Sequence, residues 1–192
     1  MIGILALQGG VSEHARMLEI LGREYRLVRR VEHLEGLTGI ILPGGESTTI
    51  STLLELGGLL EPLRHLVQQG LPAYGTCAGM ILLSSRVLDT RADAHCLGAL
   101  DITVRRNAFG RQVDSFEETL DIAGKKVNAT FIRAPWVEEI GPGVEVLART
   151  ANGAIVAVKH NHVLATSFHP ELGQDTTVHE LFIDMVDNST SA

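Results

Sequence analysis

Short apolar runs alternate with longer stretches of helical periodicity in the first half of the chain. We expect strands at 2–7, 25–30, 39–45 and 72–79, and the last of these leads into a turn. We expect helices at 12–22, 47–70 and 78–85. The middle helix should break near Gly57-Gly58, because adjacent glycines interrupt helical periodicity. Strands that alternate with helices in this way predict an α/β fold, with an open, mostly parallel central sheet and flanking helices.

The second half of the chain has a different pattern, with strand-like runs separated by Gly, Asn and Pro turns. These strands are expected within 100–106, 111–122, 125–135, 144–150 and 154–171. Asn152-Gly153 lies between two apolar runs and predicts a hairpin. A final helix is expected at 176–188, where the apolar residues form one stripe. We see no repeat or linker and therefore expect residues 1–192 to form a single domain with a strand-rich C-terminal half.

Charge and composition exclude several classes of function. The formal net charge is −7 and no concentrated basic block is present, which disfavours nucleic acid and anionic membrane surfaces as partners. No segment approaches the ~20 apolar residues of a membrane span, and the first apolar run is too short for a signal peptide. We therefore expect a cytoplasmic protein. In a reducing compartment Cys77 and Cys96 are not expected to form a structural disulfide, so each is considered separately.

Cys77 lies between two glycines in the segment GTCAG, where a predicted strand meets a predicted helix. One interpretation is packing, because cysteine is a small apolar side chain. The other is a nucleophile elbow, in which a strained strand-to-helix turn exposes the nucleophile and leaves no room for neighbouring side chains. At a helix N-terminus the thiolate would be favoured over the thiol. The amide of Ala78, directly after the cysteine, would then be placed to bind a developing oxyanion.

A thiol nucleophile requires a base, and His169 is the best candidate among the eight histidines. It follows the apolar run VLATSF and precedes Pro170 and Glu171. A residue before proline favours extended geometry, and residues two apart in extended backbone point the same way. His169 and Glu171 are therefore expected to pair, with the carboxylate orienting the imidazole.

A third motif, LPGGEST at 42–48, follows another predicted strand. Ser47 or Thr48 could cap the next helix, and the amide of Gly45 is our candidate for the second oxyanion donor. The simpler alternative is a glycine turn followed by a capped helix. His160 and His162 share one face of a predicted strand, but no third ligand is evident, so we expect no metal site. Cys96 is expected to be a packed residue.

The segments PGGEST, GTCAG and SFHPE, in this order, resemble the class I glutamine amidotransferases, which are Cys-His-Glu glutaminases. Adding LALQGG, RRNAFGRQVDSFE and FIRAP narrows the resemblance to the glutaminase subunit of pyridoxal 5′-phosphate synthase. GTCAG and HPE are signals of the whole class, whereas RNAFGRQVDSFE and FIRAP are specific to the subunit. The matching segments span nearly the whole chain.

This resemblance implies a flavodoxin-like three-layer fold and hydrolysis of L-glutamine to glutamate and ammonia through a thioester on Cys77. It implies that His169 and Glu171 complete the triad and that no cofactor is required. The glutamine-binding positions that carry over are Gly45, Glu46, Ser47, Arg106, Ile132 and Arg133. The implied partner is a barrel-shaped synthase subunit, which uses the ammonia for vitamin B6 synthesis within a large ring-shaped hetero-oligomer. Gln8 falls in a region that the family uses near the synthase contact.

Other functions remain open on the residues alone. The chain could be a glutaminase subunit that serves another biosynthetic pathway, a cysteine-elbow peptidase, a redox sensor or a non-catalytic binding module. A redox sensor would need neither the His169-Glu171 pair nor a donor at Gly44-Gly45. The assignment to vitamin B6 synthesis rests on the resemblance only.

Overall fold

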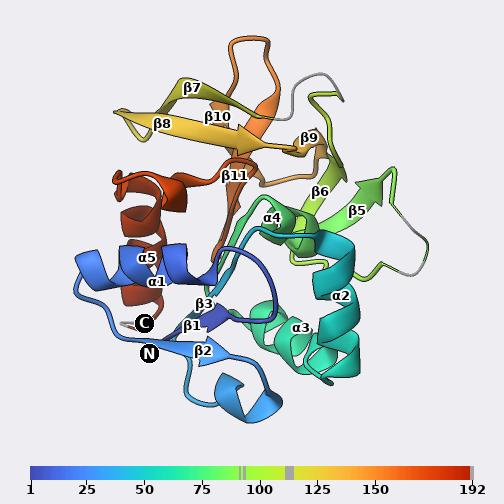
Figure 1. Ribbon diagram of the computed structural model, residues 1–192, viewed down its shortest axis with the longest axis vertical. Helices are drawn as coiled ribbons and strands as arrows, with labels where there is room; N and C mark the ends of the chain where they lie inside the picture. The colour runs from blue at the N-terminus through green and yellow to red at the C-terminus, as the bar shows by residue number, and fades with distance from the viewer. Residues whose placement is uncertain (91, 93, 111–114, 191–192) are drawn as a thin grey trace.

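The computed structural model describes residues 1–90, 92, 94–110 and 115–190 and contains one large sheet with helices on both faces (Figure 1). The strands of this sheet are β1 (Ile2–Leu5), β2 (Tyr25–Val28), β3 (Gly39–Leu42), β4 (Ala73–Thr76), β5 (Ser84–Leu88), β6 (Leu100–Arg105), β9 (Trp136–Ile140), β10 (Glu145–Arg149), β11 (Ile155–His160) and β12 (Val163–Thr166). A separate two-stranded sheet consists of β7 (Ser115–Ile122) and β8 (Lys125–Ile132). The helices are α1 (Val11–Ile20), α2 (Ser47–Leu56), α3 (Leu60–Gln68), α4 (Ala78–Leu83) and α5 (Thr177–Thr190), with short 3-10 helices η1 (Val31–Leu34) and η2 (Pro170–Leu172).

The large sheet is parallel in one part and mixed in the other. Its strand order is β2-β1-β3-β4-β12-β11-β9-β6-β5, and β10 pairs with β11. The pairings from β2 to β12 are parallel, whereas β11 is antiparallel to β12, β9 and β10. The expected open parallel sheet is therefore correct for the N-terminal half. The carboxyl ends of β3, β4 and β12 lie side by side, where ligands bind in open α/β sheets.

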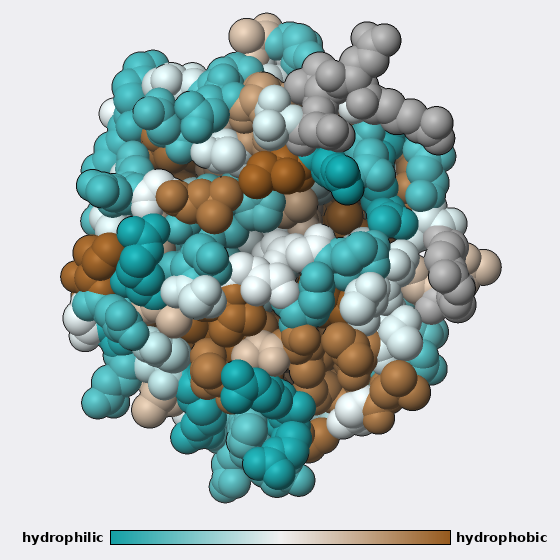
Figure 2. All heavy atoms as spheres, viewed as in Figure 1, coloured by the Kyte–Doolittle hydropathy of each residue, from teal (hydrophilic) through white to brown (hydrophobic). Residues whose placement is uncertain are grey.

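Helices cover both faces of the parallel part, which gives three layers (Figure 1). Along β3, the side chains of Ile40 and Leu42 pack with α2, α3 and α4, whereas Ile41 packs with α1 and α5 on the opposite face. This alternation follows from the two-residue period of a strand, and burial on both faces requires a continuous apolar run. In Figure 2, apolar side chains gather on the surface near α2 and α3, where Leu56 is 79% exposed.

The antiparallel pair β7-β8 lies above the end of the sheet that carries the carboxyl ends of β4 and β12 (Figure 1). Its inner face contributes Leu120, Val127 and Phe131 to the same apolar cluster as α5. The backbone amide of His169 donates to the carbonyl of Thr130 at 2.9 Å and so ties β8 to the segment after β12. The hairpin therefore brings the end of β8 close to residues that lie far from it in sequence.

Most expected elements form, and several boundaries differ. The expected helix break is present, since α2 ends at Leu56 and α3 begins at Leu60. The Asn152-Gly153 hairpin also forms, between the antiparallel strands β10 and β11. The expected helix at 78–85 ends at Leu83, because β5 begins directly at Ser84. Strands β5 and β9 were not expected. Residues 111–114 of the strand expected at 111–122 lie outside the described residues.

None of the described helices is both long enough and apolar enough to cross a membrane.

Candidate active site

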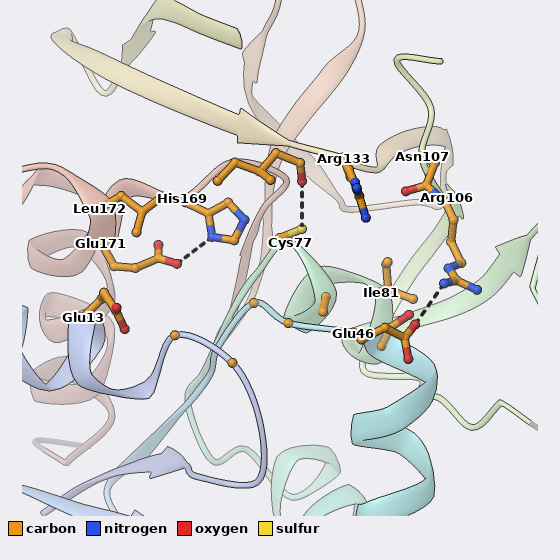
Figure 3. Close-up of a pocket in the computed structure, with 17 residues that line it drawn as sticks. Glu13, Glu46, Cys77, Ile81, Arg106, Asn107, Arg133, His169, Glu171 and Leu172 are labelled. Carbon is orange, nitrogen blue, oxygen red and sulfur yellow. Dashed lines mark hydrogen bonds and ion pairs between the residues drawn. The ribbon is translucent and has the colours of Figure 1, made fainter. Parts of the chain in front are cut away.

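One cavity of about 460 Å³ opens at the carboxyl ends of the parallel strands. It is lined by the loop after β3, the junction between β4 and α4, η2 with the residue before it, and the end of β8 (Figure 3). Its other walls are the loops that follow β1 and β6. Six separate segments of the chain therefore meet at one edge of the sheet.

Cys77 occupies a sharp strand-to-helix turn between β4 and α4. Its backbone has φ 49° and ψ −102°, a left-handed conformation that is uncommon for a non-glycine residue. A Cβ atom on Gly75 would lie 2.5 Å from the backbone of Gly79, and one on Gly79 would lie 2.1 Å from the carbonyl oxygen of Leu42. Both glycines are therefore required by close backbone packing. The turn has the strained geometry expected of a nucleophile elbow.

The Cys77 thiol lines the cavity although the residue is only 8% exposed. Its backbone amide donates to the carbonyl of Thr166 on β12 at 2.8 Å, which fixes the turn to the neighbouring strand. Its Sγ contacts the carbonyl oxygen of Ile132 at 3.9 Å (Figure 3). The imidazole of His169, which follows β12, lines the same cavity and interacts electrostatically with the thiol.

Glu171 pairs with His169 on the side of the imidazole away from the thiol. Nδ1 of His169 lies 2.7 Å from Oε1 of Glu171, and Figure 3 shows the carboxylate directed at the ring. We expected an extended segment here, and this is wrong: His169 is the N-cap of η2, which begins at Pro170. Proline is well tolerated at the first helical position because its missing N–H needs no partner there. A tight helical turn, and not strand alternation, brings the two side chains together.

The electrostatic environment strongly favours the charged form of His169. Burial alone would lower the pKa of this imidazole. The neighbouring sulfur of Cys77 and the carboxylate of Glu171, which is hydrogen-bonded to Nδ1, outweigh burial and raise the pKa of His169 to about 10. An imidazolium therefore lies between the sulfur and a buried carboxylate. This arrangement suits proton transfer to and from a thiol nucleophile.

The loop after β3 approaches the triad without side chains in between. A Cβ atom on Gly44 would lie 2.4 Å from Cε1 of His169, and one on Gly9 would lie 1.7 Å from the carbonyl oxygen of Gly44. The amide of Gly44 donates to Oγ1 of Thr76 at 3.1 Å. The amide of Gly45 makes no hydrogen bond within the described part of the chain. This amide is therefore free to bind a ligand.

Glu46, and not Ser47 or Thr48, caps α2. Its carboxylate accepts from the amides of Thr48 at 3.2 Å and Thr49 at 2.7 Å. Partial burial opposes ionisation, but the hydrogen bonds from these two threonines lower the pKa of Glu46 to about 2. The amide of Glu46 in turn donates to Oε1 of Gln8 at 2.8 Å. The cap thus joins the loops that follow β1 and β3.

Two arginines lie on the side of the cavity opposite His169. The guanidinium of Arg106 is 3.2 Å from Oε1 of Glu46, and the side chain of Arg133 points into the same cavity (Figure 3). Arg133 and Asn107 both have φ of 44°. Together with Cys77, three non-glycine residues in the left-handed region line this one cavity. Strained backbone of this kind concentrates at functional sites.

The chain matches one protein-family model over residues 4–188, that of the SNO glutamine amidotransferase family. It belongs to this family. It is 63% identical over 187 residues to pyridoxal 5′-phosphate synthase subunit PdxT of Corynebacterium jeikeium (strain K411), and the match covers 96% of each chain. It is 56% identical over 195 residues to the protein of the same name from Rhodococcus opacus (strain B4), with 97% of this chain and 96% of the relative covered.

Solved structures agree with the family assignment. The crystal structure of a glutamine amidotransferase superposes with a TM-score of 0.91 at 46% identity, covering 97% of this chain and 98% of the other. The structure of PurLQS from Thermotoga maritima superposes with a TM-score of 0.69 at 16% identity, which shows a shared fold alone. The predicted fold class and the resemblance to the glutamine amidotransferases are thus confirmed.

The cavity of this SNO family member brings together every site residue predicted from the sequence: Gly45, Glu46, Ser47, Cys77, Ala78, Arg106, Ile132, Arg133, His169 and Glu171. Several other residues that line the cavity were not predicted from the sequence, namely Gly9, Gly10, Glu13, Ile81, Asn107 and Leu172. The glycine pair at 9–10, in the loop after the first strand, was an available signal. Residues 111–114 of the segment RNAFGRQVDSFE lie outside the described residues.

The two histidines considered as a metal pair and the second cysteine lie away from this cavity. Nε2 of His162 is 2.7 Å from the carbonyl oxygen of Val67. The ring of His160 lies beside Gly143. Burial raises the pKa of the Cys96 thiol, whose Sγ is 3.4 Å from the carbonyl oxygen of Ile81. Across 1–90, 92, 94–110 and 115–190, no group of three or more His, Cys, Asp or Glu side chains is arranged so that it could hold a metal ion.

Proposed function

We propose that this glutamine amidotransferase hydrolyses L-glutamine to L-glutamate and ammonia, and that the ammonia supplies a synthase subunit that makes pyridoxal 5′-phosphate. One observation carries the proposal. The thiol of Cys77, the imidazole of His169 and the carboxylate of Glu171 meet in one cavity of a chain that is 63% identical to a pyridoxal 5′-phosphate synthase subunit. The thiol–imidazole–carboxylate order is that of a nucleophile, its base and an orienting group.

In the proposed reaction the Cys77 thiolate attacks the side-chain carboxamide carbon of glutamine. The oxygen becomes an oxyanion, which the amides of Gly45 and Ala78 stabilise. His169 donates a proton to the departing nitrogen, so ammonia leaves and a thioester forms between Cys77 and the glutamyl group. His169 then takes a proton from water, which attacks the thioester and releases glutamate and the thiol. Glu171 holds the imidazole and stabilises its charge throughout.

Glutamine binding is proposed on the side of the cavity opposite His169. The guanidinium of Arg106 can bind the α-carboxylate of glutamine through two parallel hydrogen bonds. Glu46, whose carboxylate lies beside Arg106, can accept a hydrogen bond from the α-ammonium group. Ser47, Ile132 and Arg133 complete the proposed substrate-binding set. A bound glutamine would then direct its carboxamide toward Cys77.

The partner is proposed to be the barrel-shaped synthase subunit, in a large hetero-oligomer within the cytoplasm. Two glycines can reorient a peptide plane at little steric cost, so docking could set the Gly44-Gly45 peptide for catalysis. The glutaminase rate should therefore rise when the synthase subunit is added. Equal glutaminase rates with and without the synthase subunit would contradict activation by the partner, but would not contradict glutamine hydrolysis itself.

Covalent labelling separates this function from its rivals. A diazoketone analogue of glutamine should add its glutamyl ketone mass to Cys77, and a Cys77→Ala variant should remain unlabelled at every position. Cys96→Ala provides the matched control and should label as the wild type does. A peptidase would instead be labelled by peptide-based reagents and not by the glutamine analogue, and a redox sensor would be oxidised by peroxide without reacting with either. Ammonia release from glutamine by Cys77→Ala in complex with the synthase subunit would refute the mechanism.

A further inference from the structure

A chain of buried polar side chains lies directly behind the triad and takes no part in the proposed chemistry. His14 on α1 and His179 on α5 are both 0% exposed, as are Thr76 and Glu171. Nδ1 of His14 lies 2.9 Å from Nε2 of His179. On the other side of its ring, Nε2 of His14 lies 3.1 Å from Oγ1 of Thr76 and 3.7 Å from Oε1 of Glu171. The ring of His14 therefore bridges α5 and the triad carboxylate.

The surroundings keep both of these histidines neutral. Burial, and then the proximity of His179 and His169, lower the pKa of His14 well below its ordinary value. Burial lowers the pKa of His179 to about 4. A neutral imidazole carries one N–H donor and one acceptor nitrogen. The hydrogen bonds of the pair can therefore run in only two directions.

The two directions differ in what they leave unpaired. Nδ1 of His179 has no hydrogen-bond partner among the described residues. If His14 donates from Nδ1 to His179, this unpartnered nitrogen must carry a proton, and a buried N–H without an acceptor costs about 1–3 kcal/mol. If His179 donates from Nε2 to His14, the unpartnered nitrogen is only an acceptor. The N–H on Nε2 of His14 then faces Thr76 and the carboxylate of Glu171, whose negative charge also favours it.

Thr76 extends the same chain to the proposed oxyanion loop. Its Oγ1 accepts from the amide of Gly44 at 3.1 Å and lies within hydrogen-bond distance of Nε2 of His14. Gly44 precedes the proposed oxyanion donor, and Glu171 holds the proposed base. One histidine therefore contacts the supports of both catalytic groups.

We propose that His14 is a positioning residue for glutamine hydrolysis: its Nε2–H, directed by His179, holds Thr76 and the Gly44 loop in register with the carboxylate of Glu171. The inference rests on the proposed glutaminase function. His14 does not touch substrate, so it acts on the rate of the chemical steps and not on glutamine binding.

A pair of matched substitutions tests this role. In His14→Gln the side-chain amide nitrogen reaches the position of Nε2 and can still donate to Thr76. In His14→Asn the shorter amide reaches only the position of Nδ1, toward His179. Each variant loses one of the two contacts, so a merely structural role predicts similar losses of stability and activity in both. Positioning predicts that kcat of the complex with the synthase subunit falls about 10-fold or more in His14→Asn, at nearly unchanged KM. His14→Gln should stay within about threefold of the wild type, a partial rescue.

Equal kcat values for the two variants at equal thermal midpoints, or wild-type kcat in His14→Asn, would overturn the proposal. A second measurement covers the case in which the variants fail to fold. Long-range proton–nitrogen NMR of the wild-type protein, labelled with ¹⁵N-histidine, reports which nitrogen carries the proton. We expect the Nε2–H tautomer for both His14 and His179, and an Nδ1–H tautomer of His14 would also overturn the proposal. If the wild-type complex releases no ammonia from glutamine, the proposed glutaminase function is refuted. The tautomer measurement does not depend on that activity and still tests the predicted protonation of His14.

Discussion

Nδ1 of His169 lies 2.7 Å from Oε1 of Glu171, across a proline that begins a 3-10 helix. The guanidinium of Arg16 donates to the backbone carbonyls of Glu171 at 3.0 Å and of Gly173 at 2.8 Å, which anchors this turn to α1. Oε2 of Glu171 has no hydrogen-bond partner among the described residues, so His169 is the principal hydrogen-bond donor to this buried carboxylate. The hydrogen bond to Glu171 therefore fixes the orientation of the His169 imidazole.

Replacing Glu171 by Gln should impair catalysis far more than binding. An amide cannot stabilise the imidazolium, so the pKa of His169 should fall from its value of about 10. We expect kcat to decrease on the order of 10⁴-fold with little change in KM, by analogy with the loss of the orienting carboxylate in other triads. Steady-state glutamate release and NMR titration of His169 measure the two effects. Glu180→Gln, a change at a surface carboxylate paired with Lys125, serves as the control. An unchanged pKa of His169 in Glu171→Gln would contradict the assignment.

Adding a methyl group at Gly44 should displace the base. The new Cβ would lie 2.4 Å from Cε1 of His169 and 3.4 Å from Cβ of Cys77. Because misplacing reacting groups by about 1 Å can cost ~10²-fold, we expect kcat of Gly44→Ala to fall by roughly that factor. The nearest atoms to a Cβ on Gly173 lie at 3.7 Å or more, so Gly173→Ala should retain kcat. Wild-type kcat in Gly44→Ala would contradict this prediction, because it would show that the loop accommodates the methyl group without displacing His169.

The central strands and the local site motifs could be predicted because their signals are local. Strand β3 is a continuous apolar run, and its burial on both faces leaves no room for polar side chains. The glycines around Cys77 are required by the elbow itself. Strand β9 was not predicted, because only Val137 among its residues is buried and no alternation of apolar residues results.

The support behind the triad could not be predicted, because it exists only through tertiary packing. His14 and His179 are separated by 165 positions along the chain, yet their ring nitrogens lie 2.9 Å apart. Before the fold is known, each looks like an ordinary polar residue on an amphipathic helix. The 3-10 turn at Pro170 was also missed, since His-Pro alone favours extended backbone at the histidine. The histidine pair and the 3-10 turn both depend on burial against segments that are distant in the sequence.

The two adjacent arginines at the end of β6 offer a matched test of substrate binding. Arg106 lies beside Glu46 in the cavity, whereas Arg105 pairs with Asp89 at 2.7 Å and with Glu138 outside it. Charge-assisted hydrogen bonds contribute about 1.5–3 kcal/mol, so Arg106→Ala should lower kcat/KM about 10–100-fold, mainly through KM. Arg105→Ala should keep KM for glutamine near the wild-type value. An unchanged KM in Arg106→Ala would exclude it as the carboxylate partner.

The buried histidines should make stability depend on pH on both sides of the ordinary imidazole pKa of about 6.5. For His14 and His179 the folded-state pKa is lowered, so the unfolded chain binds more protons below that value. Stability is then lost as the pH falls from about 6.5 toward the pKa of His179 at about 4. For His169 the folded-state pKa is raised. Its contribution is complete below about 6.5 and is lost as the pH rises toward about 10.

Urea unfolding at pH 5, 6.5 and 8 checks this dependence. Each proton taken up on unfolding changes the free energy of unfolding by at most about 1.4 kcal/mol per pH unit, so the acidic limb should be steep. The groups near the two rings are Tyr74, Thr76, His169 and Glu171, and none of them is altered in a His179→Phe variant. That variant should flatten the acidic limb and leave the alkaline limb unchanged. His65→Gln, at an exposed position on α3, should keep both wild-type slopes. An acidic limb of wild-type slope in His179→Phe would mean that the buried pair does not control acid stability.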